Sequence, residues 1–95
     1  MRLKRALKIA AVSGALVVAG AAPAMATIVY VGGGTWDYGA NAYYVWSDYY
    51  HGSKCHSSTS VGTSIDSDEA SAGSWSRTQV TAALYGNKSY YSTTC

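Results

Sequence analysis

Short runs of β-favouring residues, broken by glycines, alternate along the chain after residue 26. Residues 27–31 read TIVYV, the triplet 32–34 is Gly-Gly-Gly, and Thr35–Tyr38 read TWDY. Tyrosine, tryptophan, valine, isoleucine and threonine favour strands, whereas glycine lets the backbone turn freely. The pattern predicts about five or six short strands in an all-β fold. This would be a small antiparallel β-sandwich of two short, hairpin-built sheets, or a small barrel.

The longest β-rich run, Ala40–Tyr50, meets His51-Gly52 and continues as Ser53–Val61. A two-residue loop that ends in glycine, between two such runs, predicts a β-hairpin in which the numbers of paired residues sum to 103. Period-two alternation sorts the side chains onto two faces, and a slip of one residue would exchange the faces. The face predicted to be the core carries Tyr44, Trp46, Cys55 and Val61.

A second hairpin is predicted where Trp75–Tyr85 and Lys88–Thr94 flank Gly86-Asn87, with paired numbers that sum to 173. A helical turn in residues 80–84 is the alternative, which the β-branched residues of that segment disfavour.

The segment between the two hairpins, Gly62–Ser74, is small, polar and acidic, and is expected to be a long loop. Its acids are Asp66, Asp68 and Glu69. They lack the spacing of a calcium-binding loop, so a solvated loop is favoured over a calcium site.

The N-terminal residues predict a secretory signal peptide. Four basic residues lie among the first eight, the apolar run Ile9–Ala22 follows, and the segment PAMA provides a small-x-small exit. This run is shorter than the roughly 18–20 residues of a membrane span, although an uncleaved anchor is the alternative. We expect cleavage between Ala26 and Thr27. Residues 1–26 would then be the signal and residues 27–95 the mature domain, exported to the extracellular space without stable membrane insertion.

Removal of the signal would reverse the sign of the net charge. The whole chain carries +2, but four of its seven basic residues lie within the first 26. The remainder holds Lys54, Arg77 and Lys88 against five acidic residues, a net charge of −2. A weakly acidic domain has no electrostatic footprint for nucleic acid and no cationic face for disrupting membranes.

Cys55 and Cys95 are the two cysteines of the chain. After export, thiols are expected to oxidise, and a single intramolecular pairing is possible. Closing that loop would contribute roughly 4 kcal/mol to stability in the loop-entropy description. An intermolecular bridge through Cys95 and two free thiols are the alternatives.

His51, Cys55 and His56 fall within six positions, yet they do not predict a metal or catalytic centre. Zinc needs three or four converging ligands, whereas neighbours on a strand point to opposite faces, so that Cys55 and His56 diverge. A Cys–His hydrolase would need thiolate and imidazole within reach of each other. We therefore expect no enzymatic activity, no metal and no cofactor. His51 would shape the turn, and His56 would stand near Ser47 on a sheet face, exposed or half-covered.

Lys54 lies opposite Tyr49 in the predicted register, on a face that also carries Tyr43 and His56. Aromatic rings stack on sugar rings and a cation pairs with an anion, so this patch suits a ligand that contains both. A lysine stem packed over a solvated tyrosine is the alternative.

Four segments resemble the lactococcin 972-like bacteriocins. They are GGTWDYG (Gly33–Gly39), VWSDYYHGSKCHSST (Val45–Thr59), AGSW (Ala72–Trp75) and the NKSYYST that starts at Asn87. The resemblance implies a secreted β-sandwich without modified rings that inhibits related bacteria. It also implies interference with cell-wall synthesis at the septum, through binding of the lipid-linked wall precursor, lipid II.

That precursor carries sugars, an anionic pyrophosphate and a peptide, which suits the patch around Lys54. The positions that match the family are Trp36, His51, Gly52, Lys54, His56, Ser57 and Trp75. The candidate target-binding residues are Lys54, Tyr49, Tyr43, His56 and Trp36. A secreted β module for adhesion or carbohydrate binding, without killing activity, is the alternative function.

Three features depart from the family pattern, one of which is the acidity of the 62–74 segment, from which a different target or species range is expected. Cys55 stands where a threonine-like residue is expected, and Cys95 is an added terminal partner, so the pair resembles an acquired staple. The acidity of the mature domain argues against a mechanism based on general attraction to anionic envelopes.

Overall fold

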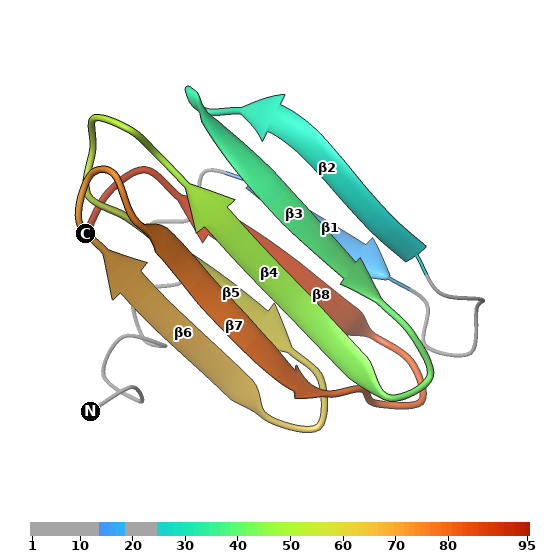
Figure 1. Cartoon of the computed structure of the whole chain (residues 1–95). Coiled ribbons are helices and arrows are strands. Elements are labelled where there is room, and N and C mark those ends of the chain that lie inside the picture. The colour runs from blue at the N-terminus through green and yellow to red at the C-terminus, as the bar shows by residue number, and fades with distance from the viewer. Residues whose placement is uncertain (1–13, 19–24) are drawn as a thin grey trace.

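Eight strands make up the computed structural model, which describes residues 14–18 and 25–95 (Figure 1). In chain order they are β1 (Gly14–Val18), β2 (Met25–Val31), β3 (Gly34–Ala40), β4 (Tyr44–Tyr50), β5 (His56–Val61), β6 (Ile65–Ala70), β7 (Trp75–Thr81) and β8 (Asn87–Ser92). The β4 sheet has the strand order β2-β3-β4-β7, and the β5 sheet has the order β1-β8-β5-β6. The two antiparallel sheets pack face to face. The predicted all-β sandwich is therefore confirmed for the described residues, and residues 80–84 form no helical turn.

The hairpin of β2 and β3 follows the glycine pattern of the sequence. Gly32 and Gly33 have φ angles of 65° and 82°, a region that glycine adopts without strain. Gly34 is needed for a different reason, because a Cβ atom there would collide with the backbone carbonyl of Tyr50. No helix long and apolar enough to cross a membrane occurs within the described ranges.

Most of the predicted signal peptide lies outside the described residues. Residues 14–18 form β1, an edge strand that pairs with β8. The predicted cleavage site between Ala26 and Thr27 falls within β2 and stays a prediction. Because β1 is at the edge, cleavage would leave the order β8-β5-β6 intact.

The hairpin predicted at His51-Gly52 was wrong, because β4 and β5 lie in different sheets. β4 pairs with β3 and β7, whereas β5 pairs with β6 and β8. Residues 51–55 instead carry the chain from one sheet to the other. His51 is buried, and its Nδ1 accepts hydrogen bonds from the backbone N–H groups of Ser53 and Lys54, each at 3.1 Å. The connection is thus wound around an imidazole ring rather than closed as a two-residue turn.

The prediction of which face of β4 is buried and which is exposed was also wrong. Val45, Ser47 and Tyr49 are fully buried, whereas Tyr44 and Trp46 lie on the outward side. Period-two alternation grouped the residues correctly, but the bulkier set was chosen as the core. The structure buries the set that contains a serine.

The second predicted hairpin was wrong as well, since β7 pairs with β4 and β8 pairs with β5 and β1. The segment Gly62–Ser74 is not a long loop, because it contains β6, paired along its length with β5. An acidic strand is stable here as a sheet edge, where charges discourage pairing with other chains. The Asp68 carboxylate also accepts a 3.0 Å hydrogen bond from the backbone N–H of Arg77.

Two small apolar clusters fill the ends of the space between the sheets. At one end Trp36, Tyr49 and Tyr91 pack together, with ring centroids 4.9 Å apart for Trp36–Tyr91 and 4.7 Å apart for Tyr49–Tyr91. The other cluster consists of Ala40, Val45 and Val80.

Hydroxyl side chains fill the centre of the interior and bind the backbone of the opposite sheet. Ser47 Oγ donates to the carbonyl of Tyr90 at 2.7 Å, and Ser89 Oγ donates to the carbonyl of Trp46 at 2.9 Å. Because serine is short, these bonds require the sheets to lie closer there than the roughly 10 Å typical of packed sheets. The space beside Ser47 and Ser89 suits small side chains, whereas the rings of Trp36, Tyr49 and Tyr91 are accommodated at one end of the interior.

His56 is fully buried, which corrects the expectation of an exposed or half-covered position. Its Nδ1 lies 2.7 Å from the carbonyl oxygen of Lys54, and its Nε2 lies 2.7 Å from that of Ser74. The ring therefore joins the two connections, 51–55 and 71–74, that cross between the sheets at this end.

The Cys55–Cys95 disulfide is confirmed, with Cα atoms 5.8 Å apart. It lies just beyond the last residue pair of the β5–β8 ladder, Ser57 and Ser92. The disulfide therefore fixes the C-terminus to the connection that follows β4.

Replacing both cysteines, Cys55→Ser with Cys95→Ser, should lower the free energy of unfolding by about 4 kcal/mol, because the unfolded chain regains the freedom of a 40-residue loop. Urea unfolding followed by circular dichroism measures this change. Equal midpoints for the variant and the oxidised parent would show that the disulfide adds no stability.

Candidate functional site: the outer aromatic face

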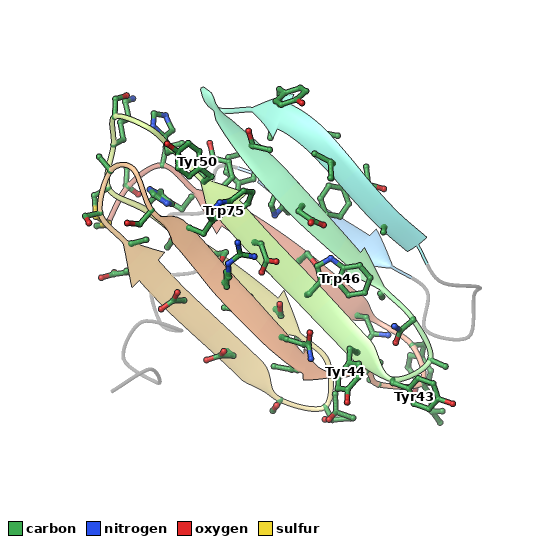
Figure 2. All side chains as sticks on the ribbon, in the orientation of Figure 1. Tyr43, Tyr44, Trp46, Tyr50 and Trp75 are labelled. Atoms are coloured by element: carbon green, nitrogen blue, oxygen red, sulfur yellow. A yellow bond between two sulfur atoms is a disulfide. The ribbon has the colours of Figure 1, made fainter. Side chains whose placement is uncertain are left out.

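Bulky side chains gather on the outward side of the β4 sheet, where Figure 2 shows Trp46, Tyr50 and Trp75. The strand register sets the outward residues in rows across the sheet. The rows are Tyr30, Thr35, Tyr50 and Trp75; then Ile28, Asp37, Asp48 and Arg77; then Ala26, Gly39, Trp46 and Gln79. We define the outer aromatic face as Tyr44, Trp46, Tyr50 and Trp75 together with Asp37, Asp48 and Arg77.

A chain of contacts organises one half of this face. The Tyr50 and Trp75 rings have centroids 5.6 Å apart, and the Arg77 guanidinium lies 4.7 Å from the centroid of Trp75. Arg77 Nη1 also donates to Asp48 Oδ2 at 3.2 Å. A cation held between an aromatic face and a carboxylate has few orientations to choose from, so these side chains are pre-ordered.

Two carboxylates occupy the centre of the face, because Asp37 and Asp48 are direct partners across β3 and β4. Burial raises the pKa of Asp48, the nearby Arg77 charge lowers it, and Asp37 raises it again, with a net upward shift. Trp46 Nε1 donates to Asp37 Oδ1 at 3.1 Å. Like charges directly opposite each other destabilise a sheet. A local rule broken at a surface position is typical of a functional site.

The aromatic rings flank the carboxylate pair on both sides. Tyr50 and Trp46 are four residues apart on β4, which corresponds to about 13 Å along the strand. Tyr44, half-exposed, extends the face beyond Trp46. Flat rings stack on the apolar side of a sugar, and carboxylates accept hydrogen bonds from hydroxyls. The face can therefore bind a short chain of linked sugar rings.

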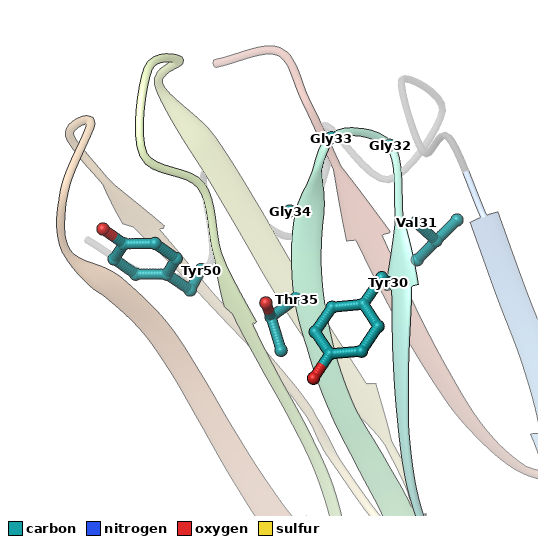
Figure 3. Close-up of a pocket in the computed structure, with 7 residues that line it drawn as sticks. All are labelled: Tyr30, Val31, Gly32, Gly33, Gly34, Thr35 and Tyr50. Atoms are coloured by element: carbon teal, nitrogen blue, oxygen red, sulfur yellow. The ribbon is translucent and has the colours of Figure 1, made fainter.

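A pocket of about 340 Å³ borders this face at the Tyr50 end (Figure 3). Its lining residues are Tyr30, Val31, Gly32, Gly33, Gly34, Thr35 and Tyr50. The three glycines leave the space open, since they carry no side chains. A sugar stacked on Tyr50 has room there for a bulky substituent.

Three of the predicted target-binding residues lie in the interior. Trp36 donates through Nε1 to Ser47 Oγ at 2.9 Å, and Tyr49 donates through its hydroxyl to the carbonyl of Val31 at 2.8 Å. Burial, with the neighbouring Tyr91, raises the pKa of Tyr49 to about 12. Together with His56, these residues build the fold rather than an outward surface.

The other two predicted residues, Lys54 and Tyr43, are exposed but lie beyond opposite ends of β4. The expected pairing of Lys54 with Tyr49 was wrong, because it rested on the β4–β5 hairpin. Lys54 lies in the connection directly after Tyr50, at the pocket end of the outer aromatic face. Among residues whose side chains are described, no cluster of three or more His, Cys, Asp or Glu is placed to hold a metal ion.

Sequence reasoning missed the outward set Asp37, Tyr50, Trp75 and Arg77, and assigned Trp46 to the core. The signal that could have found it was the alternation along β4. One residue set contains two serine-sized or aliphatic positions, and the other contains only large or charged side chains. The pairing of Asp37 with Asp48 could not be predicted from the sequence, because it depends on the register between β3 and β4.

A small disulfide-closed β-sandwich with an aromatic outer face is the class of protein that this geometry defines. The model of the Lactococcin_972 bacteriocin family matches residues 32–91 of the chain. The protein therefore belongs to the lactococcin 972 family of bacteriocins. No match to the chain was found among curated proteins or among solved structures.

The raised pKa of Asp48 predicts how a substitution changes the pH dependence of stability. A carboxyl group with a higher pKa in the folded state stabilises the fold fully at low pH and loses that contribution as the pH rises through the folded pKa. Asp48→Asn cannot ionise, so the variant should become more stable relative to the parent between about pH 3 and pH 7. Thermal melts at both pH values measure this change. A variant that loses stability relative to the parent over the same range would contradict the prediction.

Proposed function

We propose that this protein is a secreted, non-enzymatic antibacterial protein that inhibits cell-wall synthesis and septum formation in related bacteria by binding lipid II, the lipid-linked wall precursor. Membership of the bacteriocin family over residues 32–91 is the observation that carries the proposal. A cell-wall target fits the outer aromatic face, because that face has the rings and hydrogen-bonding groups that suit sugars.

The outer aromatic face is the proposed contact for the sugar part of the precursor. Asp37 and Asp48 outnumber Arg77 there, so the face carries a net negative charge and disfavours the pyrophosphate. Lys54 is an exposed cation just beyond Tyr50. A ligand with its sugars across the face would place its anionic group at the Lys54 end.

Trp46→Ala and Trp75→Ala should each weaken binding of the soluble wall disaccharide–peptide by about tenfold, because each removes a stacking surface. Isothermal titration calorimetry measures the affinity. Tyr85→Ala is the matched control, since it removes an exposed aromatic ring outside the face. If the control weakens binding as much as the tryptophan variants do, the face is not the sugar site.

Lys54→Ala tests the anionic end of the same ligand. It should weaken binding of the pyrophosphate-containing precursor several-fold and leave binding of the disaccharide without phosphate unchanged, because only the former offers a partner for the ammonium group. Titrations of the two ligands in parallel make the comparison. Equal effects on both would remove Lys54 from the proposed anion contact.

The outer aromatic face also supports the alternative, a secreted module for adhesion or carbohydrate binding that does not kill. An inhibition-zone assay on dividing related bacteria separates the two. Zones with septal defects, reduced by Trp46→Ala, are expected for the bacteriocin. Sugar binding by the parent without any zone would favour the alternative.

A further inference from the structure

Among the residues whose side chains are described, five of the eight exposed large hydrophobic side chains lie at one end of the sandwich. They are Tyr43, Tyr44, Ile65, Leu84 and Tyr85, on three neighbouring turns. We define the uncharged tip as residues 41–44, 62–65 and 82–86, none of which is acidic or basic. Figure 2 shows Tyr43 and Tyr44 at this end, away from Tyr50 and Trp75.

Hydrogen bonds hold the turns of the tip to one another. Ala82 N donates to the carbonyl of Tyr43 at 2.8 Å, and Thr63 N donates to that of Thr81 at 2.9 Å. The Asn41 carboxamide oxygen accepts the N–H groups of Tyr43 and Tyr44, both at 2.7 Å. The apolar side chains are therefore presented on a fixed backbone and need little ordering when they bind.

The turn at 82–86 carries the two most exposed of these five side chains. Leu84 and Tyr85 are 86% and 81% exposed, and a Cβ added at Gly86 would meet no atom within 4 Å. The buried side chain of Asn87 holds the base of this turn, through hydrogen bonds of 2.8 and 3.0 Å to the N–H and carbonyl groups of Ala83. The side chains of Leu84 and Tyr85 are thus exposed to solvent. Polar residues would fit equally well at these two positions, so the fold does not require apolar ones.

We propose that the uncharged tip docks onto a lipid bilayer, with Leu84, Tyr85 and Tyr43 inserted at the level of the headgroups. Tyrosine, with an apolar ring and a polar hydroxyl, is enriched at membrane–water interfaces, and leucine gains from transfer to the acyl boundary. The neighbouring charges, Asp66 and Lys88, have opposite signs, so the docking is driven by apolar burial and needs no anionic lipid. Protruding turns can insert into a fluid bilayer without a matching shape. Binding to a second copy of this chain would instead need a complementary concave surface.

Sedimentation with phosphatidylcholine vesicles that contain no wall precursor tests this docking, whatever the outcome for the sugar site. The parent should bind, and raising the salt from about 0.1 M to 1 M should not release it. The double variant Leu84→Ser with Tyr85→Ser should bind at least about tenfold more weakly, because it removes two exposed apolar groups. Ile28→Ser, which changes an exposed aliphatic residue on the β4 sheet, should bind within about twofold of the parent.

Thermal melts that match the parent establish that the double variant is folded. Three results would each overturn the proposal: no vesicle binding by the parent, equal binding by the double variant, or release by salt. A fourth is a parent dimer in sedimentation velocity that the double variant dissolves, which would assign the tip to self-association.

Discussion

Hydrogen bonds from buried serine hydroxyls to the backbone of the opposite sheet are the constraint on which the structure depends. Ser47 accepts the Trp36 indole N–H and donates to Tyr90, so one hydroxyl joins an interior ring to the facing sheet. Ser60 and Thr78 share a 2.7 Å hydrogen bond across the same gap. These bonds hold the facing sheets together at the centre through small hydroxyl side chains. The rings of Trp46, Tyr50 and Trp75 lie on the outer side of the sheet, where we propose that they contact a ligand.

The sequence was sufficient for the class of fold and for the disulfide, because both follow from local signals. Alternation, aromatic content and glycine spacing predict short strands, and two cysteines allow one intramolecular bridge. The resemblance in GGTWDYG and HGSKCHS also led to the family that the match over residues 32–91 shows.

The partners of each strand were not predictable from local signals. His51-Gly52 has the composition of a hairpin turn, but the His51 ring accepts two backbone hydrogen bonds and turns the chain into the other sheet. The same error displaced the candidate site, because Tyr49 and His56 fell on the predicted outer face and are buried. Size misled the choice of core: the face that carries Tyr44 and Trp46 was preferred, whereas the structure buries Ser47, whose hydroxyl is satisfied by the carbonyl of Tyr90 in the opposite sheet.

One measurement tests the outward orientation of the β4 aromatic residues most directly: hydrogen–deuterium exchange of the three tryptophan indole N–H groups, followed by NMR. We expect slow exchange for Trp36, whose buried indole N–H donates to Ser47 Oγ, fast exchange for Trp75, and an intermediate rate for Trp46. Slow exchange at Trp46 together with fast exchange at Trp36 would show that β4 turns its opposite face inward. That result would contradict both the serine-lined interior and the outer aromatic face.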